Sequence, residues 1–171
     1  TFWEEAVPLA NQLAAAFGLP GNPLSACDIA RNKGMTRELM KTSGLPAAKF
    51  FRIFGTEQLD AAIEEVGFPA IIKPVFGAAS RGVVRCDSAQ EVKDVHAELC
   101  AVLTPDVDPI WAQGQEFVLE EFYDGDEFDI DVLLCDGEAV FVKVSDNWPC
   151  QPPYYQETGE NAPTLASADK V

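Results

Sequence analysis

The chain has 171 residues, of which 28 are acidic and 12 basic, so its formal net charge is −16. A surface with this charge repels nucleic acid and anionic membranes, and neither is expected as a partner. The same surface repels nucleotides, so a nucleotide site needs locally concentrated Lys or Arg side chains or backbone N–H groups.

The first part of the chain is predicted to be helical. Apolar residues recur at three- and four-residue intervals from Phe2 to Phe17, and Pro8 either kinks this helix or marks its true start. Further helices are predicted at residues 24–31 and 35–42, the second ending before Gly44.

From residue 49 the pattern changes to short strands that alternate with helices. Strands are predicted at residues 49–54, 69–75, 83–86, 116–122, 127–135 and 138–145. Helices are predicted at residues 57–66, with Thr56 as N-cap, and at 89–102. Asp136-Gly137 is a strong signal for a hairpin turn. This order of elements predicts an α+β fold with two lobes.

Cysteine and histidine do not form a metal-site pattern. The five cysteines are odd in number and lack the two-residue spacing of zinc and redox motifs, so free thiols in a reducing compartment are expected. The single histidine, His96, is expected on the surface of its helix. A zinc site and a Ser/His/Asp hydrolase are therefore disfavoured.

Targeting signals are not evident. No apolar run approaches the roughly 18 residues of a membrane span, and no basic signal region precedes the first helix. We therefore expect a cytoplasmic protein. The chain begins without Met and ends at Val171 without a closing element, so we expect it to be a fragment of a longer protein.

Lys73 is the sharpest anomaly in the sequence, because it follows the apolar run Ala70-Ile71-Ile72 and precedes Pro74. A buried ammonium group costs several kcal/mol unless an anion or hydrogen bonds meet it. Taken alone, Lys73 fits a ligand site and an edge strand whose lysine reaches water equally well.

The loop that follows Lys73 favours the ligand site. Residues 77–82 are Gly-Ala-Ala-Ser-Arg-Gly, and small residues let backbone N–H groups approach phosphate oxygens. The loop is not a P-loop, because it lacks Gly-Lys-Ser/Thr and connects two strands. Together with Lys73 it supplies the local positive charge that the acidic chain otherwise lacks.

A third candidate element is the acidic strand end at residues 118–127. Paired acids here indicate metal ligands, a general base or a solvated edge. A further role fits better, in which one carboxylate accepts a hydrogen bond from the adenine amine and Glu127 reaches the ribose hydroxyls.

Taken together, Ile-Ile-Lys-Pro, the small-residue loop and Glu-Glu-aromatic-x-x-Gly-x-Glu resemble the ATP-grasp superfamily over residues 28–145. The resemblance implies two α+β lobes with ATP in the cleft between them and the loop as a lid over the phosphates. Asn32-Lys33, before Gly44-Leu45-Pro46, resembles the family's other phosphate-binding lysine. The resemblance implies nucleotide contacts for Lys33, Lys73, Gly77, Ala78, Ala79, Ser80, Gly82, Glu120, Glu121, Phe122, Tyr123 and Glu127.

Lys73 and the loop residue Arg81 are the candidate catalytic cations. By resemblance, Glu120 meets the adenine amine, and the backbones of Glu121 and Tyr123 meet the ring edge. The chain then divides into an N-terminal helical end (1–48), the small lobe with its phosphate loop (49–115) and an incomplete C-terminal lobe (116–171). The family's Mg²⁺ ligands are expected beyond residue 171, so this fragment is expected to be inactive.

A narrower resemblance, carried by residues 141–149 and 155–163, is to the carnosine synthase branch, which joins histidine to a small ω-amino acid such as β-alanine. The expected activity is ATP-dependent carboxylate–amine ligation through an acyl phosphate, with amino acids as substrates. Asp146 and Glu157 either face substrate or are surface acids. The alternatives are a non-catalytic nucleotide-binding regulatory module and a biotin-dependent carboxylase subunit. Oligomeric state is left open.

Overall fold

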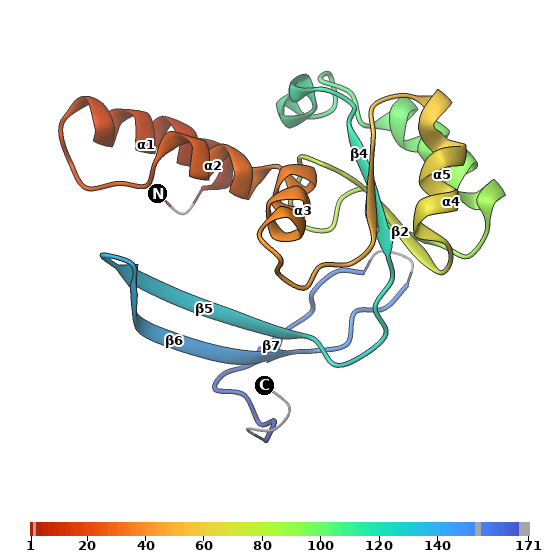
Figure 1. Cartoon of the computed structure of the whole chain (residues 1–171). Coiled ribbons are helices and arrows are strands. Elements are labelled where there is room, and N and C mark those ends of the chain that lie inside the picture. Colours follow the sequence, from red (N-terminus) through yellow and green to blue (C-terminus); the bar gives the residue numbers. More distant parts are fainter. Residues whose placement is uncertain (2, 153–154, 168–171) are drawn as a thin grey trace. The chain divides into compact units, whose positions relative to one another are not determined.

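The computed structural model describes residues 1, 3–152 and 155–167 (Figure 1). Contacts within the chain group it into two compact units, Thr1–Phe122 and Tyr123–Val171. Helices and strands occur together and all strand pairs are antiparallel, which confirms the α+β prediction. Phe2, which contributes to the first helical pattern, lies outside the described residues.

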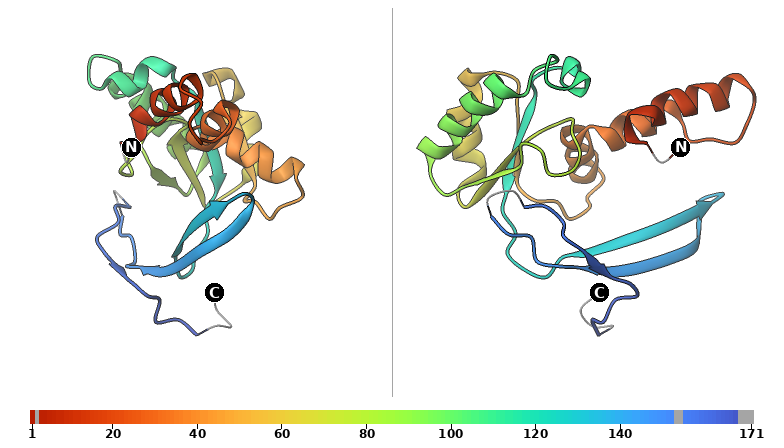
Figure 2. Two further views of the ribbon diagram at one scale, coloured as in Figure 1. Left: turned by 90° about the vertical axis from the view of Figure 1, so that its left-hand side faces the viewer. Right: turned by 180° about the vertical axis from the view of Figure 1, so that it is seen from behind.

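Three helices begin the first unit: α1 (Val7–Ala16), α2 (Leu24–Arg31) and α3 (Lys33–Thr42). A short 3-10 helix, η1 (Glu4–Ala6), precedes them. Pro8 lies in the first turn of α1, so it marks the helix start and produces no kink. Contacts run from α1 to α2 and from α2 to α3, and Figure 2 shows α1 and α2 extending away from the sheet.

A four-stranded sheet with the order β1-β4-β2-β3 forms the centre of the first unit. Its strands are β1 (Phe50–Ile53), β2 (Ala70–Pro74), β3 (Val84–Cys86) and β4 (Phe117–Glu121). The last strand in sequence therefore inserts between the first two. The predicted lobe boundary at residue 116 falls before β4, whereas the contacts keep β4 with the first unit.

Helices α4 (Leu59–Val66) and α5 (Ala89–Val102) lie on one side of this sheet, and α3 lies on the other (Figures 1 and 2). Two 3-10 helices, η2 (Thr56–Gln58) and η3 (Pro109–Gln113), precede α4 and β4 respectively. Gly67 ends α4 with a φ of 79°, as its position after the helical pattern predicts.

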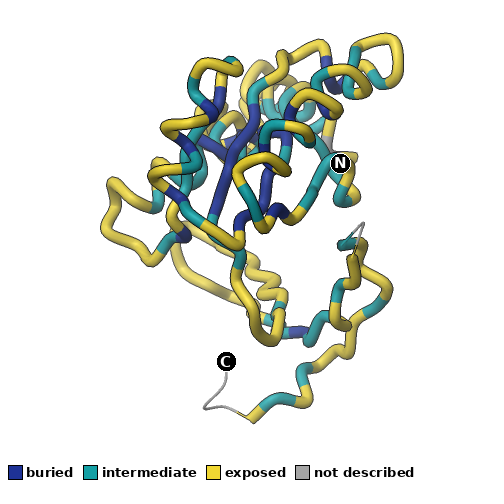
Figure 3. Tube along the Cα trace, turned by 90° about the vertical axis from the view of Figure 1, so that its right-hand side faces the viewer, coloured by how far each residue is buried: buried dark blue, intermediate teal, exposed yellow. Residues whose placement is uncertain are grey.

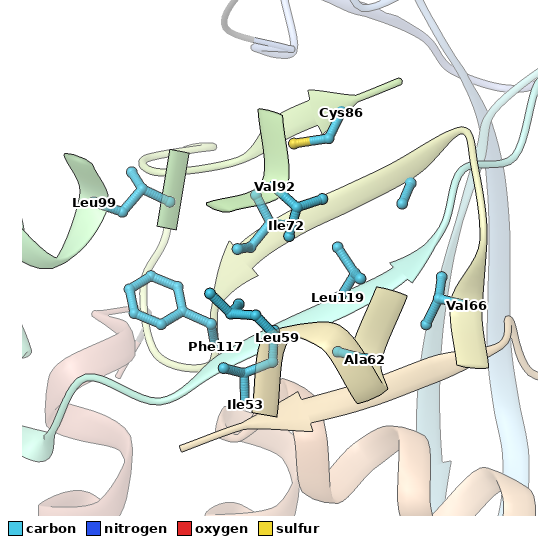
Figure 4. Packing of buried hydrophobic residues seen from close by; sticks show 11 residues of the cluster. Ile53, Leu59, Ala62, Val66, Ile72, Cys86, Val92, Leu99, Phe117 and Leu119 are labelled. Carbon is cyan, nitrogen blue, oxygen red and sulfur yellow. The ribbon is translucent and has the colours of Figure 1, made fainter. Parts of the chain in front are cut away.

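The hydrophobic core fills the side of the sheet that α4 and α5 cover. Alternate residues of β2 and β4 point there, and Ala70, Ile72, Phe117 and Leu119 are 0–1% exposed. Figure 3 shows the buried positions concentrated along these strands, and Figure 4 shows their packing against Leu59, Ala62 and Val92. The opposite face of the same strands carries the buried apolar residues Ile71 and Val118 together with the charged side chains of Lys73 and Glu120.

Two predictions about this unit are wrong. Thr56 does not cap a helix; it is the first residue of the 3-10 turn η2, and the N-cap of α4 is Gln58, which forms no side-chain cap hydrogen bond. His96 is not on the surface, because it is 3% exposed and its ring contacts Phe117 edge-on at 5.0 Å between centroids. The helical pattern of α5 places His96 one turn from Val92 and Leu99, on the same buried face.

The second unit is a three-stranded sheet of β5 (Phe128–Cys135), β6 (Glu138–Asn147) and β7 (Glu160–Asn161). Asp136 and Gly137 join β5 to β6 with φ values of 51° and 84°, as the sequence predicts for a tight hairpin turn. All five cysteines are free, as expected. No described helix is long and apolar enough to cross a membrane.

Candidate nucleotide site

Lys73 and Glu120 lie on the face of the sheet that points away from the core. In the register of β2 and β4, Glu120 stands opposite Ile71, two residues before Lys73. Alternation puts residues 71 and 73 on one face, and the diagonal neighbour across an antiparallel pair is within reach of a long side chain. The Lys73 Nζ accordingly donates to Glu120 Oε1.

Glu120 binds a second cation through its other oxygen, because Arg37 Nε of α3 donates to Oε2 at 2.9 Å. The Glu120 side chain is 9% exposed, and that of Lys73 is 16% exposed. Burial raises the pKa of Glu120, but the charge of Lys73 and the hydrogen bonds from Arg37 and Lys73 outweigh it, so the pKa lies below its ordinary value. Glu120 is therefore an ionised, acceptor-only group.

The N-terminus of α3 is fixed close to β2. Asn32 caps the helix, since its Oδ1 accepts from Met35 N at 2.8 Å, and Lys33 N donates to the Val75 carbonyl at 3.3 Å. Gly34 permits a close approach, because a Cβ there would lie 2.7 Å from Arg52 Nε. Lys33 Nζ consequently reaches the loop at residues 77–82, the candidate phosphate-binding loop, and donates to the Gly77 carbonyl at 2.8 Å.

The loop itself has an unusual backbone. Ala79 and Ser80 both have a φ of 55°, and Gly77 and Gly82 have φ values of 140° and 75°. Left-handed conformations at residues with a Cβ cost of order 1–3 kcal/mol each and are concentrated at ligand-binding segments. The conformation brings the loop around a pocket of about 210 Å³. The pocket is lined by Lys33, Lys73, Pro74, Gly77, Ala78, Ala79, Ser80, Arg81 and Val83.

Three of the chain's 12 basic residues, Lys33, Lys73 and Arg81, thus line one small pocket. This is the local concentration of positive charge that an acidic chain needs to hold a polyanion. Arg81 also forms an ion pair with Asp108 at 2.6 Å, and its guanidinium lies 6.0 Å from the Trp111 ring centroid. A backbone hydrogen bond from Ile110 and the contact with Arg81 lower the pKa of Asp108.

Glu121 and Phe122, which follow Glu120, form backbone hydrogen bonds within the first unit. Glu121 N donates to the Lys49 carbonyl at 2.9 Å, so a base contact through the backbone of Glu121 would have to use its carbonyl. Phe122 N donates to the Pro69 carbonyl at 3.1 Å, and its ring lies under the Arg85 guanidinium. The predicted contacts of Glu121 and Phe122 stay predictions.

Tyr123 and Glu127 belong to the second unit. Tyr123 is 67% exposed, and the carbonyl of Glu127 accepts from Asn147 N at 3.0 Å. Asp146 is engaged within the same unit, since it accepts from the Thr164 hydroxyl and from Leu165 N. Glu157 is exposed.

The described residues contain no group of three or more His, Cys, Asp or Glu side chains that could hold a metal ion. The sequence-based expectation that the metal ligands lie beyond residue 171 stays a prediction.

Arg37 is the site residue that sequence reasoning missed. Its only local signal is its spacing of four residues from Lys33, which places both cations on one face of a helix. The sequence does not show which residue this helix face contacts, because the partner of Arg37, Glu120, is 83 residues away in the chain.

Comparisons with known proteins agree with this geometry. A family model described as "ATP-grasp domain" matches residues 66–162. Carnosine synthase 1 of Gallus gallus is 30% identical over 182 residues, covering 99% of this chain and 19% of that protein. The chain therefore spans about a fifth of the length of this relative.

Solved structures show the same similarity. The L-amino acid ligase from Bacillus licheniformis superposes with a TM-score of 0.82 and 28% identity, over 99% of this chain and 39% of that chain. The biotin carboxylase domain of 2-oxoglutarate carboxylase from Hydrogenobacter thermophilus, solved with MgADP, gives a TM-score of 0.72 at 18% identity. It covers 95% of this chain and 36% of that chain, and at this identity it supports the fold alone.

Proposed function

The chain belongs to the ATP-grasp domain family, and from this premise we propose that it carries the phosphate- and adenine-binding residues of an ATP-dependent carboxylate–amine ligase. The observation that carries the proposal is the convergence of Lys33 from α3, Lys73 from β2 and the loop 77–82 on one pocket. Relatives that are named as amino acid ligases support the choice of reaction class.

In this reaction a carboxylate oxygen of the first substrate attacks the γ-phosphorus of ATP, and ADP leaves. The amine of the second substrate then attacks the acyl carbon of the acyl phosphate, and inorganic phosphate leaves. Neither step needs a covalent nucleophile from the protein, because the substrate carboxylate and the substrate amine are the attacking groups. Its contribution is to bind, to orient and to neutralise charge.

Lys33 and Lys73 are proposed to bind the phosphates, and the small-residue loop to cover them and exclude water while the mixed anhydride exists. Arg81, held by Asp108 at the loop's end, is a candidate for the transferred phosphoryl group. Glu120 is proposed to accept from the adenine amine, with the backbones of Glu121 and Tyr123 at the ring edge and Glu127 at the ribose.

The proposed substrates are two amino acids, and the carnosine type, histidine with β-alanine, is the first pair to test. The similarity to carnosine synthase 1 supports this choice. A cytoplasmic location is likewise proposed, because ATP and free amino acids are both present there.

Replacing Lys73 with Met tests the proposal. The variant removes the ammonium group while keeping the length of the side chain, and Arg37 still pairs with Glu120. In the complete protein we expect ATP-dependent phosphate release to fall by orders of magnitude, measured across amino acid pairs that include β-alanine with histidine.

The matched control is Lys93→Met, because Lys93 lies on α5 and pairs with the exposed Asp60. Circular dichroism should show both variants folded. Near-normal turnover in Lys73→Met would contradict the proposal. If the complete wild-type protein binds ATP but releases phosphate with no amino acid pair, the result would favour the non-catalytic nucleotide-binding module.

A further inference from the structure

Two cations of α3 stand one turn apart on the same face of the helix. Lys33 donates to the Gly77 carbonyl at 2.8 Å, and Arg37 donates to Glu120 at 2.9 Å. The spacing of four residues makes these side chains neighbours on a helix surface. Through them α3 contacts the phosphate loop and the carboxylate proposed for adenine.

Glu120 has one more cationic partner than its charge requires. Lys73 binds Oε1 and Arg37 binds Oε2, so two positive charges meet one carboxylate in a largely buried setting. Removing the sole partner of a buried charge is strongly unfavourable. With two partners, one cation can turn to another anion while Glu120 stays paired.

The two cations are not equivalent. Lys73 lines the pocket with Lys33 and the loop 77–82, whereas Arg37 does not line it. Lys73 is therefore placed between Glu120 and an anion in the pocket. Arg37 instead contacts Glu120 through Nε and the Met40 sulfur of its own helix through a terminal nitrogen, at 3.7 Å. A guanidinium stays charged throughout the accessible pH range and its planar N–H groups fix the direction of a carboxylate better than an ammonium does.

We propose that Arg37 is a positioning residue that holds Glu120 in place when Lys73 turns to a nucleotide phosphate, and so sets the preference for a base with an amine donor. This inference rests on the proposed function. A fixed carboxylate accepts from the adenine amine and repels the carbonyl oxygen that hypoxanthine and guanine carry at the same ring position. Without Arg37, Glu120 is free to rotate or to take up a proton, and this discrimination weakens.

The test compares the dissociation constants of ATP and inosine triphosphate, which differ at that ring position. Three variants are used: Arg37→Met, Arg37→Lys and the control Lys41→Met. Lys41 lies on the same helix, and its ammonium group lies over the Phe50 ring. We expect Arg37→Met to lower the preference for ATP about tenfold. Arg37→Lys should restore part of it, and Lys41→Met should leave it unchanged.

The ratio of two affinities does not depend on the fraction of protein that is folded, so a loss of stability alone cannot produce this result. A second readout, independent of nucleotide, is the titration of Glu120 followed by carboxyl NMR and assigned with Glu120→Gln. Arg37→Met should move that titration to higher pH.

The outcomes separate the two proposals. If the wild type prefers ATP and Arg37→Met keeps the same preference, the role of Arg37 is overturned while the ATP site stands. If the wild type binds neither nucleotide although Arg37→Met shifts the Glu120 titration, the ATP site is overturned, and the role of Arg37 in base preference with it.

Discussion

At the scale of single residues, two buried titratable groups are stabilised in different ways. Glu120 stays charged because Lys73 and Arg37 bind its two oxygens. His96 has only weak polar contacts, with its ring nitrogens 3.8 and 3.9 Å from the Cys100 thiol, and burial lowers its pKa below the ordinary value of 6.5. The first arrangement suits ligand recognition, and the second suits core packing.

His96 should make stability depend on pH near neutrality. Below about pH 6.5 the unfolded chain binds a proton at His96 that the folded chain does not, so the free energy of unfolding rises with pH and falls as the pH falls. The loss amounts to about 1.4 kcal/mol for each unit by which burial lowers the pKa. Urea unfolding between about pH 5 and about pH 7.5 measures it.

The matched variant is His96→Phe, which keeps an aromatic ring against Phe117. Because His96 is the only histidine in the chain, this variant should flatten the pH dependence in that interval. An equally steep dependence in the variant would show that other groups cause it.

At the scale of elements, the site depends on two anchored segments. Helix α3 is fixed by the Asn32 cap and by Gly34 against Arg52, which aims Lys33 and Arg37 at the sheet. The loop 77–82 is fixed by left-handed residues and by Trp111, whose ring would lie 3.0 Å from a Cβ at Gly77. Both anchors place backbone where a larger side chain would not fit.

Gly77→Ala should therefore disturb the loop. At a φ of 140° an alanine is strained, and its Cβ would press on Trp111. We expect a loss of about 1–3 kcal/mol in the free energy of unfolding and weaker ATP binding, measured by urea unfolding and by calorimetry.

Gly125→Ala is the control for the stability measurement, since nothing lies within 4 Å of a Cβ there. That variant should change stability by no more than about 0.5 kcal/mol. Equal stabilities for the two variants would show that the loop tolerates the added methyl group.

At the scale of the whole molecule, the two units differ in how far they bury apolar residues in a core. The core cluster lies entirely in the first unit, between the sheet and helices α4 and α5. In the second unit, β5 and β6 carry exposed apolar residues such as Leu133 and Phe141, 60% and 55% exposed. The stability of the described chain therefore depends mainly on the first unit.

Two leucine substitutions test this division. Leu119→Ala, at a position 0% exposed in the centre of the sheet, should lower the free energy of unfolding by about 2–5 kcal/mol. Leu133→Ala, on the hairpin, should change it by about 0.5 kcal/mol or less. Comparable losses, measured by urea unfolding, would mean that the hairpin contributes as much as the core.

Most helices and strands could be predicted from the sequence because hydrophobic period and turn residues are local signals. Gly67, the turn at Asp136-Gly137 and the strand around Lys73 were recognised in this way, and the set of short motifs was sufficient to predict the family. The prediction that His96 lies on the surface is wrong because the signal is only local. A short helical pattern with mixed polar residues does not show which face the sheet will cover.

The sequence by itself determined that the chain is α+β, that Lys73 is anomalous in its strand and that the motifs belong to one nucleotide-binding family. Only the tertiary structure decided that Lys73 and Arg37 share Glu120 and that Lys33 reaches Gly77. The contact of Lys73 with Glu120 follows from the insertion of β4 between β1 and β2 and from the register of β2 and β4, whereas the contacts of Lys33 and Arg37 follow from the anchoring of α3 beside the same strands. Sheet order and register bring together residues that lie far apart in the chain, and no local pattern encodes which distant strand a strand will meet.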